Sequence, residues 1–402
     1  MYRKFTADHI FSGFNLLPDN KVLITDELGS IIDVADKLDA GDGIESFKGI
    51  LCPGFINAHC HLELSHLKNT IPEKTGLVDF VQQVMQKRWA PTNNKLNAAT
   101  EKELLMTNAV EEMYNSGTVA VGDICNTSDS ILVKQNSTIY WHNFIEASGF
   151  VDGVAEKRLE EVSNVYDAFI KNGFNNSTTF SPHAPYSVSK TLFELLNNLT
   201  AKKLITIHNQ ETAAEDELYL DKSGGFLSLY KNLGIDIAGF SPTGLSSLQS
   251  WMPYFTKSQS IISVHNTFIS GDDIAIAKQQ IVKSNSNLFF CLCVNSNIYI
   301  ENKMPPIQLL MDNDAQIVIG TDSYASNWQL NILEEIKTIQ SKTSNTIPLE
   351  EILKWATSNG AKALQMDHLL GSFEKGKLPG IVLIENADGL LLNLNSSARR
   401  IL

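Results

Sequence analysis

Two histidines separated by one residue follow an apolar run in the stretch 51–67, LCPGFINAHCHLELSHL. On a β-strand the side chains of residues i and i+2 point to the same face, so His59 and His61 converge while Cys60 points the other way. Two imidazoles at this spacing suit a divalent metal ion. One such motif among nine histidines also arises by chance, so the rest of the chain has to supply further ligands.

Further polar residues with suitable chemistry occur where later apolar runs stop. They are His183, His208, His265 and Asp322. A single histidine of this kind is more often a hydrogen-bonded structural residue, but a whole series at the ends of apolar runs is hard to explain in that way. Neutral imidazole and carboxylate are usual ligands of zinc and ferrous iron, and a catalytic site leaves one position open for water. The set that would suffice is His59, His61, His208 and Asp322.

Two carboxylates suit the proton transfers of a hydrolytic reaction. A bound metal lowers the pKa of its water toward neutrality, and Asp322 would accept the proton that this water loses. Glu211 follows His208 by three residues, in HNQE, and would face the substrate, where it could deliver a proton to the group that leaves. The H-x-x-E spacing is weak evidence by itself, because a solvated loop glutamate gives the same pattern.

Strands that alternate with helices must position these residues. After the H-x-H stretch we expect strands at 118–124, 138–145, 177–181, 204–208, 260–265, 287–293 and 316–320. Apolar periodicity predicts helices at 76–88, 95–116, 154–171, 190–199, 271–283, 306–312, 330–341 and 349–364. The alternation predicts parallel β-α units of the α/β class. With the first strand included, we expect a TIM-like (β/α)8 barrel, whose catalytic groups lie at the C-terminal ends of its strands.

The two ends of the chain carry shorter β patterns that do not belong to this alternation. We expect residues 1–52 and 369–402 to form a small β-sandwich domain together, and residues 53–368 to form the barrel domain. The aromatic and glycine-rich segment 224–255 interrupts the rhythm and is too long for a simple connection, so we interpret it as an inserted lid-like segment.

Composition and charge argue against several classes of partner. The chain has 402 residues, is 43% hydrophobic and has a formal net charge of −13, and its basic residues are scattered. This pattern argues against nucleic acid or an anionic membrane as a partner. No signal-peptide core and no run near the ~20 apolar residues of a membrane span is present. We expect a cytoplasmic protein with a small-molecule substrate, and the composition leaves a homodimer open.

Taken together, the motifs resemble the amidohydrolase superfamily, and within it the branch of nucleobase, nucleoside and triazine aminohydrolases. The resemblance covers nearly the whole chain, in PGFINAHCHLEL, SPHAPYSVS, HNQE, SVHNTF, CVNSN, IGTDSYASN, ATSNGAKAL and GSFEKGK. It implies one divalent metal per chain, zinc or alternatively ferrous iron, on the four ligands named above. The predicted fourth strand has no lysine that could bridge two metals, which also implies a mononuclear site.

The same resemblance implies roles for four further positions. Glu211 would be the proton shuttle, and His265 would orient the attacking water or the carbonyl-like centre. His183, in SPHAPY, would contact the substrate. The segment HLELS is similar to the form found in aminofutalosine deaminases, so Glu63 could bind a substrate hydroxyl or ring nitrogen, with a buried structural acid as the alternative. The sequence departs from the usual C-P-x-S-N pattern at CVNSN and from Gly-Lys-x-Ala-Asp at GKLPG.

The function implied is hydrolytic deamination of a purine-like or nucleoside-like heterocycle, with aminofutalosine among the candidate substrates. A cyclic amide or ring-halide hydrolase is the alternative, because the same ligands serve those reactions in related families. A third hypothesis is a non-catalytic scaffold that keeps the fold. The complete set of metal ligands argues against the scaffold.

Overall fold

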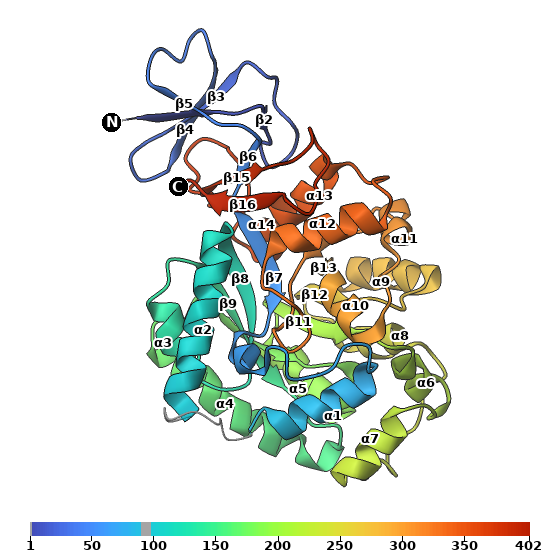
Figure 1. Ribbon diagram of the computed structural model, residues 1–402. Coiled ribbons are helices and arrows are strands. Elements are labelled where there is room, and N and C mark those ends of the chain that lie inside the picture. Colours follow the sequence, from blue (N-terminus) through green and yellow to red (C-terminus); the bar gives the residue numbers. More distant parts are fainter. Residues whose placement is uncertain (1, 90–97) are drawn as a thin grey trace.

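Two four-stranded parallel sheets occupy the centre of the computed structural model, which describes residues 2–89 and 98–402 (Figure 1). Their strand orders are β10-β9-β8-β7 and β11-β12-β13-β14. The strands are β7 (Phe55–Cys60), β8 (Thr118–Cys125), β9 (Tyr140–Ala147), β10 (Thr178–Pro182), β11 (Leu204–Asn209), β12 (Ser260–His265), β13 (Asn287–Leu292) and β14 (Ile317–Ile319). Each predicted strand is present within a few residues of its expected bounds, so the α/β class with parallel pairing is confirmed.

Hydrogen bonds also connect the outer strands of the two sheets. The His208 N–H on β11 donates to the carbonyl oxygen of His183, just beyond β10, at 2.9 Å. The Asp322 N–H, beyond β14, donates to the carbonyl oxygen of His59 on β7 at 3.1 Å, next to a parallel bridge between Cys60 and Asp322. These contacts bring the C-terminal ends of β7, β10, β11 and β14 to one place.

Helices follow the strands and pack on their outer faces, with α2 against β8, α4 against β9 and β10, and α13 against β14. The α-helices are α1 (Leu77–Lys87), α2 (Ala98–Asn115), α3 (Ile131–Gln135), α4 (Ala155–Lys171), α5 (Lys190–Leu199), α6 (Ala213–Asp221), α7 (Phe226–Leu233), α8 (Ser247–Trp251), α9 (Gly271–Ser284), α10 (Val294–Glu301), α11 (Ile307–Asp312), α12 (Ile332–Lys342), α13 (Leu349–Ala356) and α14 (Ser358–Ala363). Four 3₁₀ turns accompany them, η1 (Leu62–Leu67), η2 (Asp152–Val154), η3 (Pro185–Ser187) and η4 (Met252–Tyr254). None of the helices that the structure describes combines the length and the apolar character that a membrane span needs.

The helix prediction needs one correction and several additions. The predicted single helix 349–364 is two helices, because Thr357 has φ −128° and ψ −91°, outside the helical region. The helices α3, α6, α7, α8 and α10 were not predicted; α10 begins two residues after β13 ends, and α7 and α8 lie in the segment 224–255. Residues 95–97 of the predicted helix 95–116 lie outside the described residues.

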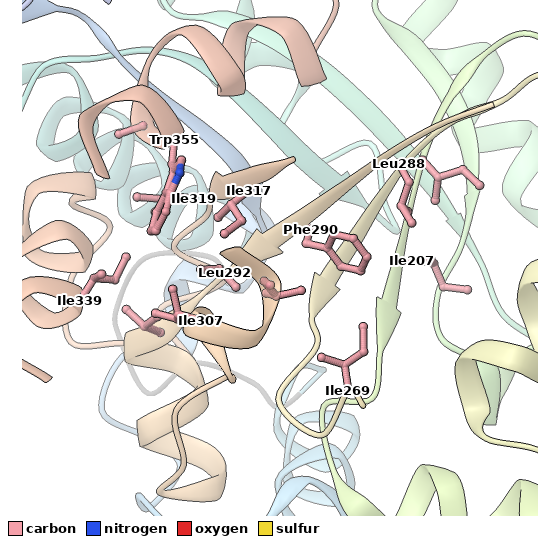
Figure 2. Packing of buried hydrophobic residues seen from close by; sticks show 14 of the residues in the cluster. Ile207, Ile269, Leu288, Phe290, Leu292, Ile307, Ile317, Ile319, Ile339 and Trp355 are labelled. Carbon is pink, nitrogen blue, oxygen red and sulfur yellow. The ribbon is translucent and has the colours of Figure 1, made fainter. Parts of the chain in front are cut away.

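The second sheet is buried on both faces, which explains its continuous apolar runs. On β13, Leu288, Phe290 and Leu292 join a cluster that packs against the surrounding helices. The alternate residues Phe289 and Cys291 join a different cluster on the other face, as the two-residue period of a strand requires. Figure 2 shows the first cluster, with side chains from β13 beside Ile317, Ile319, Ile307, Ile339 and Trp355.

Two smaller sheets lie where the termini are near each other, and one of them takes strands from both chain ends (Figure 1). The strands are β1 (Arg3–Thr6), β2 (His9–Ile10), β3 (Lys21–Thr25), β4 (Ile31–Asp36), β5 (Ile44–Ser46), β6 (Ile50–Pro53), β15 (Ile381–Glu385) and β16 (Ser397–Arg400), in the orders β4-β3-β1-β5 and β16-β15-β6-β2. The strand β15 pairs antiparallel with β6, which joins the C-terminal segment to the N-terminal one. One apolar cluster takes side chains from both sheets, among them Phe5, Leu23, Leu51, Ile381 and Leu383.

Candidate active site

Three histidine side chains meet at the strand ends. The Nε2 atom of His61 lies 3.2 Å from Nε2 of His59 and 3.2 Å from Nε2 of His208. His59 belongs to β7, His61 follows it, and His208 belongs to β11, so the H-x-H spacing and the sheet contacts together produce the cluster. Zinc–nitrogen bonds of 2.0–2.1 Å in a tetrahedron place ligand atoms about 3.3 Å apart. The geometry of the three nitrogens therefore fits a tetrahedral ion.

The three imidazoles are held in the neutral form that metal binding requires. Burial, and then the neighbouring imidazoles, hold the pKa of His59 and of His61 well below the usual value, and burial also lowers that of His208. The Nδ1–H of His208 donates to the carbonyl oxygen of His183 at 2.9 Å. This bond leaves the Nε2 lone pair of His208 directed at the cluster.

Asp322 completes the group from the end of β14. Its Oδ1 lies 3.5 Å from Nε2 of His61 and 3.8 Å from Nε2 of His59. Its Oδ2 accepts hydrogen bonds from the hydroxyls of Ser296 at 2.6 Å and Ser326 at 2.7 Å, which orient the carboxylate and favour its ionised form. The backbone of Asp322 has φ 58°, a left-handed conformation that is uncommon for a non-glycine residue and that clusters at functional sites.

Glu211 and His265 lie on the other side of Asp322. Oε2 of Glu211 is 3.5 Å from Nε2 of His265, and both side chains are buried. Burial, and then the charge of Asp322, raises the pKa of Glu211 well above its usual value, which favours the protonated form of this carboxyl group. The Nδ1–H of His265 donates to Oδ1 of Asn297 at 2.7 Å. Nε2 of His265 is then an acceptor that faces Glu211.

A buried glutamate that the sequence analysis missed fixes the position of Glu211. Oε1 of Glu215 accepts the Glu211 N–H at 2.8 Å, and its Oε2 accepts the Gln210 N–H at 2.9 Å. Glu215 lies in the first turn of α6, so this helix fixes the backbone of Gln210 and Glu211 in the turn that follows β11. The sequence analysis did not single out Glu215, four residues after Glu211, because the helix α6 that positions it was not predicted.

A cavity of about 490 Å³ opens above these groups. Its polar wall is made by His61, His183, His208, Glu211, His265 and Asp322. Its apolar wall comes mainly from two helices, with Leu77, Phe80, Val81 and Val84 of α1 and Leu229, Tyr230 and Leu233 of α7. The helix α7 belongs to the segment 224–255, so part of the segment interpreted as lid-like lines the cavity.

His183 and Glu63 have different positions relative to this cavity. His183 lines it, and its Nδ1 lies 2.6 Å from the hydroxyl of Ser187. Glu63 is buried and is not itself among the lining residues; its Oε2 accepts the N–H groups of Asn126 and Thr127 at 3.0 Å, and its Oε1 pairs with Arg88. Two of these partners, Asn126 and Arg88, do line the cavity, so Glu63 lies directly behind its wall.

Metal-dependent hydrolysis is the chemistry that such a site supports. The chain belongs to the Amidohydrolase family, whose model matches residues 50–398. It is 28% identical over 381 residues to a 5'-deoxyadenosine deaminase of Methanococcus maripaludis, a match that covers 92% of this chain and 82% of the relative.

Two solved structures have the same fold. Aminofutalosine deaminase of Helicobacter pylori, crystallised with methylthio-coformycin, superimposes with a TM-score of 0.79 at 20% identity and covers 100% of both chains. An adenosine deaminase of Xanthomonas campestris with bound zinc superimposes with a TM-score of 0.71 at 20% identity, over 95% of this chain and 84% of that one.

Proposed function

We propose that this hydrolytic enzyme deaminates a nucleoside-like substrate by replacing an amino group of its heterocycle with oxygen from water and releasing ammonia. The observation that carries the proposal is the pair of carboxyl groups beside the three imidazoles, with Asp322 oriented as an acceptor and Glu211 as a buried proton donor. The names of the relatives support the same substrate class. Aminofutalosine and 5'-deoxyadenosine are therefore the first substrates to test.

The four groups His59, His61, His208 and Asp322 would hold one divalent ion, and the zinc in the Xanthomonas campestris structure makes zinc the first choice. When bound, this ion activates water for attack on the carbon that bears the amino group. The three imidazoles contribute neutral nitrogen donors. The hydroxyls of Ser296 and Ser326 hold Asp322 so that its Oδ1 faces the imidazoles.

The protons move through the side chains of the chain itself. Asp322 Oδ1 accepts the proton of the attacking water while the new C–O bond forms. Glu211 donates its proton to the ring nitrogen next to the attacked carbon. Nε2 of His265, which lies 3.5 Å from Oε2 of Glu211, accepts a hydrogen bond from the added oxygen or from Glu211. Asp322 then passes its proton to the amino group, the C–N bond breaks, and ammonia leaves, while the proton of the added hydroxyl returns to Glu211 and restores its neutral carboxyl group. His183, in the cavity wall, would contact the rest of the substrate.

We also propose that the two parallel sheets form one (β/α)8 barrel over residues 53–368. The contacts of β10 with β11 and of β14 with β7 support this proposal. Residues 1–52 and 369–402 would form the β-sandwich domain, which the shared sheet and the shared apolar cluster support. The segment 224–255 would act as a lid, because α7 packs against α1 and both helices line the cavity.

Ammonia release on a substrate panel tests the function. Zinc-supplemented enzyme is incubated with adenosine, 5'-deoxyadenosine, aminofutalosine and guanine, and ammonia is measured beside the deaminated product. We expect one ammonia per product for at least one nucleoside, and loss of that activity in Glu211→Gln. Halide release from a chlorotriazine, or ring opening of a cyclic amide without ammonia, would support the ring-hydrolase alternative and contradict deamination.

A further inference from the structure

Glu146 is a buried carboxylate of the cavity wall that the proposed mechanism does not use. It lies at the end of β9, is 7% exposed, and lines the cavity together with Asn126 and His183. Its Oε2 accepts a hydrogen bond from Nδ2 of Asn126 at 2.9 Å. Its Oε1 is buried and has no hydrogen-bond partner among the residues that the structure describes.

The neighbouring ring nitrogens do not satisfy Oε1. Nδ1 of His208 is 3.8 Å from it, too far for a hydrogen bond, and its proton is already donated to the carbonyl oxygen of His183. Nδ1 of His183 faces the hydroxyl of Ser187 at 2.6 Å. A buried carboxylate oxygen without a donor is costly. A molecule that enters the cavity can remove this cost by donating a hydrogen bond.

A second metal ion fits this corner less well than a hydrogen-bond donor. Oε1 of Glu146 lies 3.8 Å from Nδ1 of His208, farther apart than the 3.2 Å that separates Nε2 of His61 from Nε2 of His59 and of His208. His208 would also have to give up its bond to the His183 carbonyl, since its Nε2 already faces the first cluster. A neutral hydroxyl needs neither change.

The position of Glu146 indicates which part of the substrate it meets. The reacting ring must lie by Glu211, His265 and Asp322, which form a separate group within 4.8 Å of one another. Glu146 belongs to the group on the β9–β11 side, and the residues that follow it, Phe150 among them, line the apolar part of the cavity. It therefore lies between the place of the ring and the place of an apolar substituent, where the sugar of a nucleoside would be.

We propose that Oε1 of Glu146 accepts a hydrogen bond from the 2'- or 3'-hydroxyl of the substrate's sugar, so that Glu146 makes the enzyme select nucleosides that carry this hydroxyl over free bases and over the 2'- or 3'-deoxy analogue that lacks it. The inference rests on the proposed function, because it takes the cavity to hold a nucleoside. It also gives a hydrogen-bond donor to Oε1, which has none among the residues that the structure describes.

The test compares two variants with four substrates and three deaminated products. Glu146→Met removes the acceptor and keeps the shape of the side chain, and Glu146→Gln keeps a weaker acceptor. For each enzyme, kcat/KM is measured with adenosine, 2'-deoxyadenosine, 3'-deoxyadenosine and adenine, the metal content is determined, and calorimetry gives the affinity for inosine and 2'-deoxyinosine and 3'-deoxyinosine. Calorimetry reports on Glu146 even where turnover fails.

We expect wild type to prefer adenosine over one of the two deoxy analogues by about 10- to 150-fold, the range for a hydrogen bond to a charged group. Glu146→Met should lose that preference both in kcat/KM and in product affinity, and Glu146→Gln should show an intermediate preference. In both variants, kcat/KM for adenine and the metal content should stay within threefold of the wild-type values. The proposal would be overturned if kcat/KM fell equally for all four substrates, or if the preference for adenosine did not change. Loss of metal would also overturn it, because Glu146 would then act by supporting the metal ligand His208. Absence of ammonia from every substrate with wild type would instead refute the proposed function.

Discussion

Replacing Lys134 by methionine tests how the fold supports the H-x-H stretch. Nζ of Lys134 lies 2.6 Å from Oδ2 of Asp123, and both side chains are completely buried. Oδ1 of the same aspartate accepts the N–H of Leu62, the residue after His61, at 2.8 Å. The ion pair therefore holds the backbone just after the end of β7, next to the metal-cluster residue His61.

The expected magnitude follows from the burial of the pair. Lys134→Met keeps most of the side-chain volume but leaves the Asp123 carboxylate without its cation. Loss of one partner of a buried ion pair costs about 3–5 kcal/mol. The hydrogen bond from Lys134 to Oδ1 of Asn143, at 2.8 Å, is lost as well, which places the effect toward the upper half of that range.

The assay is equilibrium urea unfolding of zinc-loaded protein. The double variant Lys134→Met with Asp123→Asn should recover most of the loss, because the amide oxygen still accepts the Leu62 N–H and no charge is buried alone. Lys354→Met is the matched control, since its ion pair with Glu351 lies on the surface and is worth at most about 1 kcal/mol. A single variant within about 1 kcal/mol of wild type, or a double variant no more stable than the single one, would refute the reasoning.

Four further substitutions address the metal cluster and its surroundings. His59→Ala should remove the bound metal, whereas His183→Ala should keep the metal and weaken substrate binding. Elemental analysis and KM, measured for both variants, separate these effects, and loss of metal from His183→Ala would show that His183 is a ligand. Asp322→Asn should lower kcat and metal affinity together, because one residue is ligand and base, and retention of either property would separate those roles. Gly320→Ala should weaken metal binding in a chelator competition, since a Cβ there would lie 2.9 Å from Sγ of Cys291 and from Cβ and O of His59; unchanged affinity would mean that the strand yields.

The strand ends were predictable from the sequence because their signal is local. Each apolar run stops at a polar residue, and parallel strands of an α/β fold deliver such residues to one edge. This reasoning places His208 and His265 beside the H-x-H pair although more than 140 residues separate them from it. The same rule, which found Asp322, would also have found Glu146 had it been applied to the end of the predicted strand 138–145.

Partnerships that arise from tertiary contacts gave no local signal. The pairing of Glu63 with Arg88 joins positions 25 residues apart through a turn that the pattern does not specify. Lys134 belongs to the five-residue helix α3, too short for a periodicity to appear, and a lysine in a predicted connection is normally solvated. The helix break at Thr357, where α13 ends and α14 packs against it, could not be predicted because the apolar residues keep a helical spacing across the break.

Metal content and ammonia release, measured on the same preparation of Glu211→Gln, test the central claim most directly. The amide has nearly the same size as the carboxyl group and removes the proton donor without removing a ligand. We predict unchanged metal per chain, retained substrate binding and a fall in kcat of roughly 10²- to 10⁴-fold, the range for lost general acid-base catalysis. Turnover close to that of wild type, with the metal in place, would contradict the assignment of Glu211 as the proton shuttle and favour a ring or halide hydrolase.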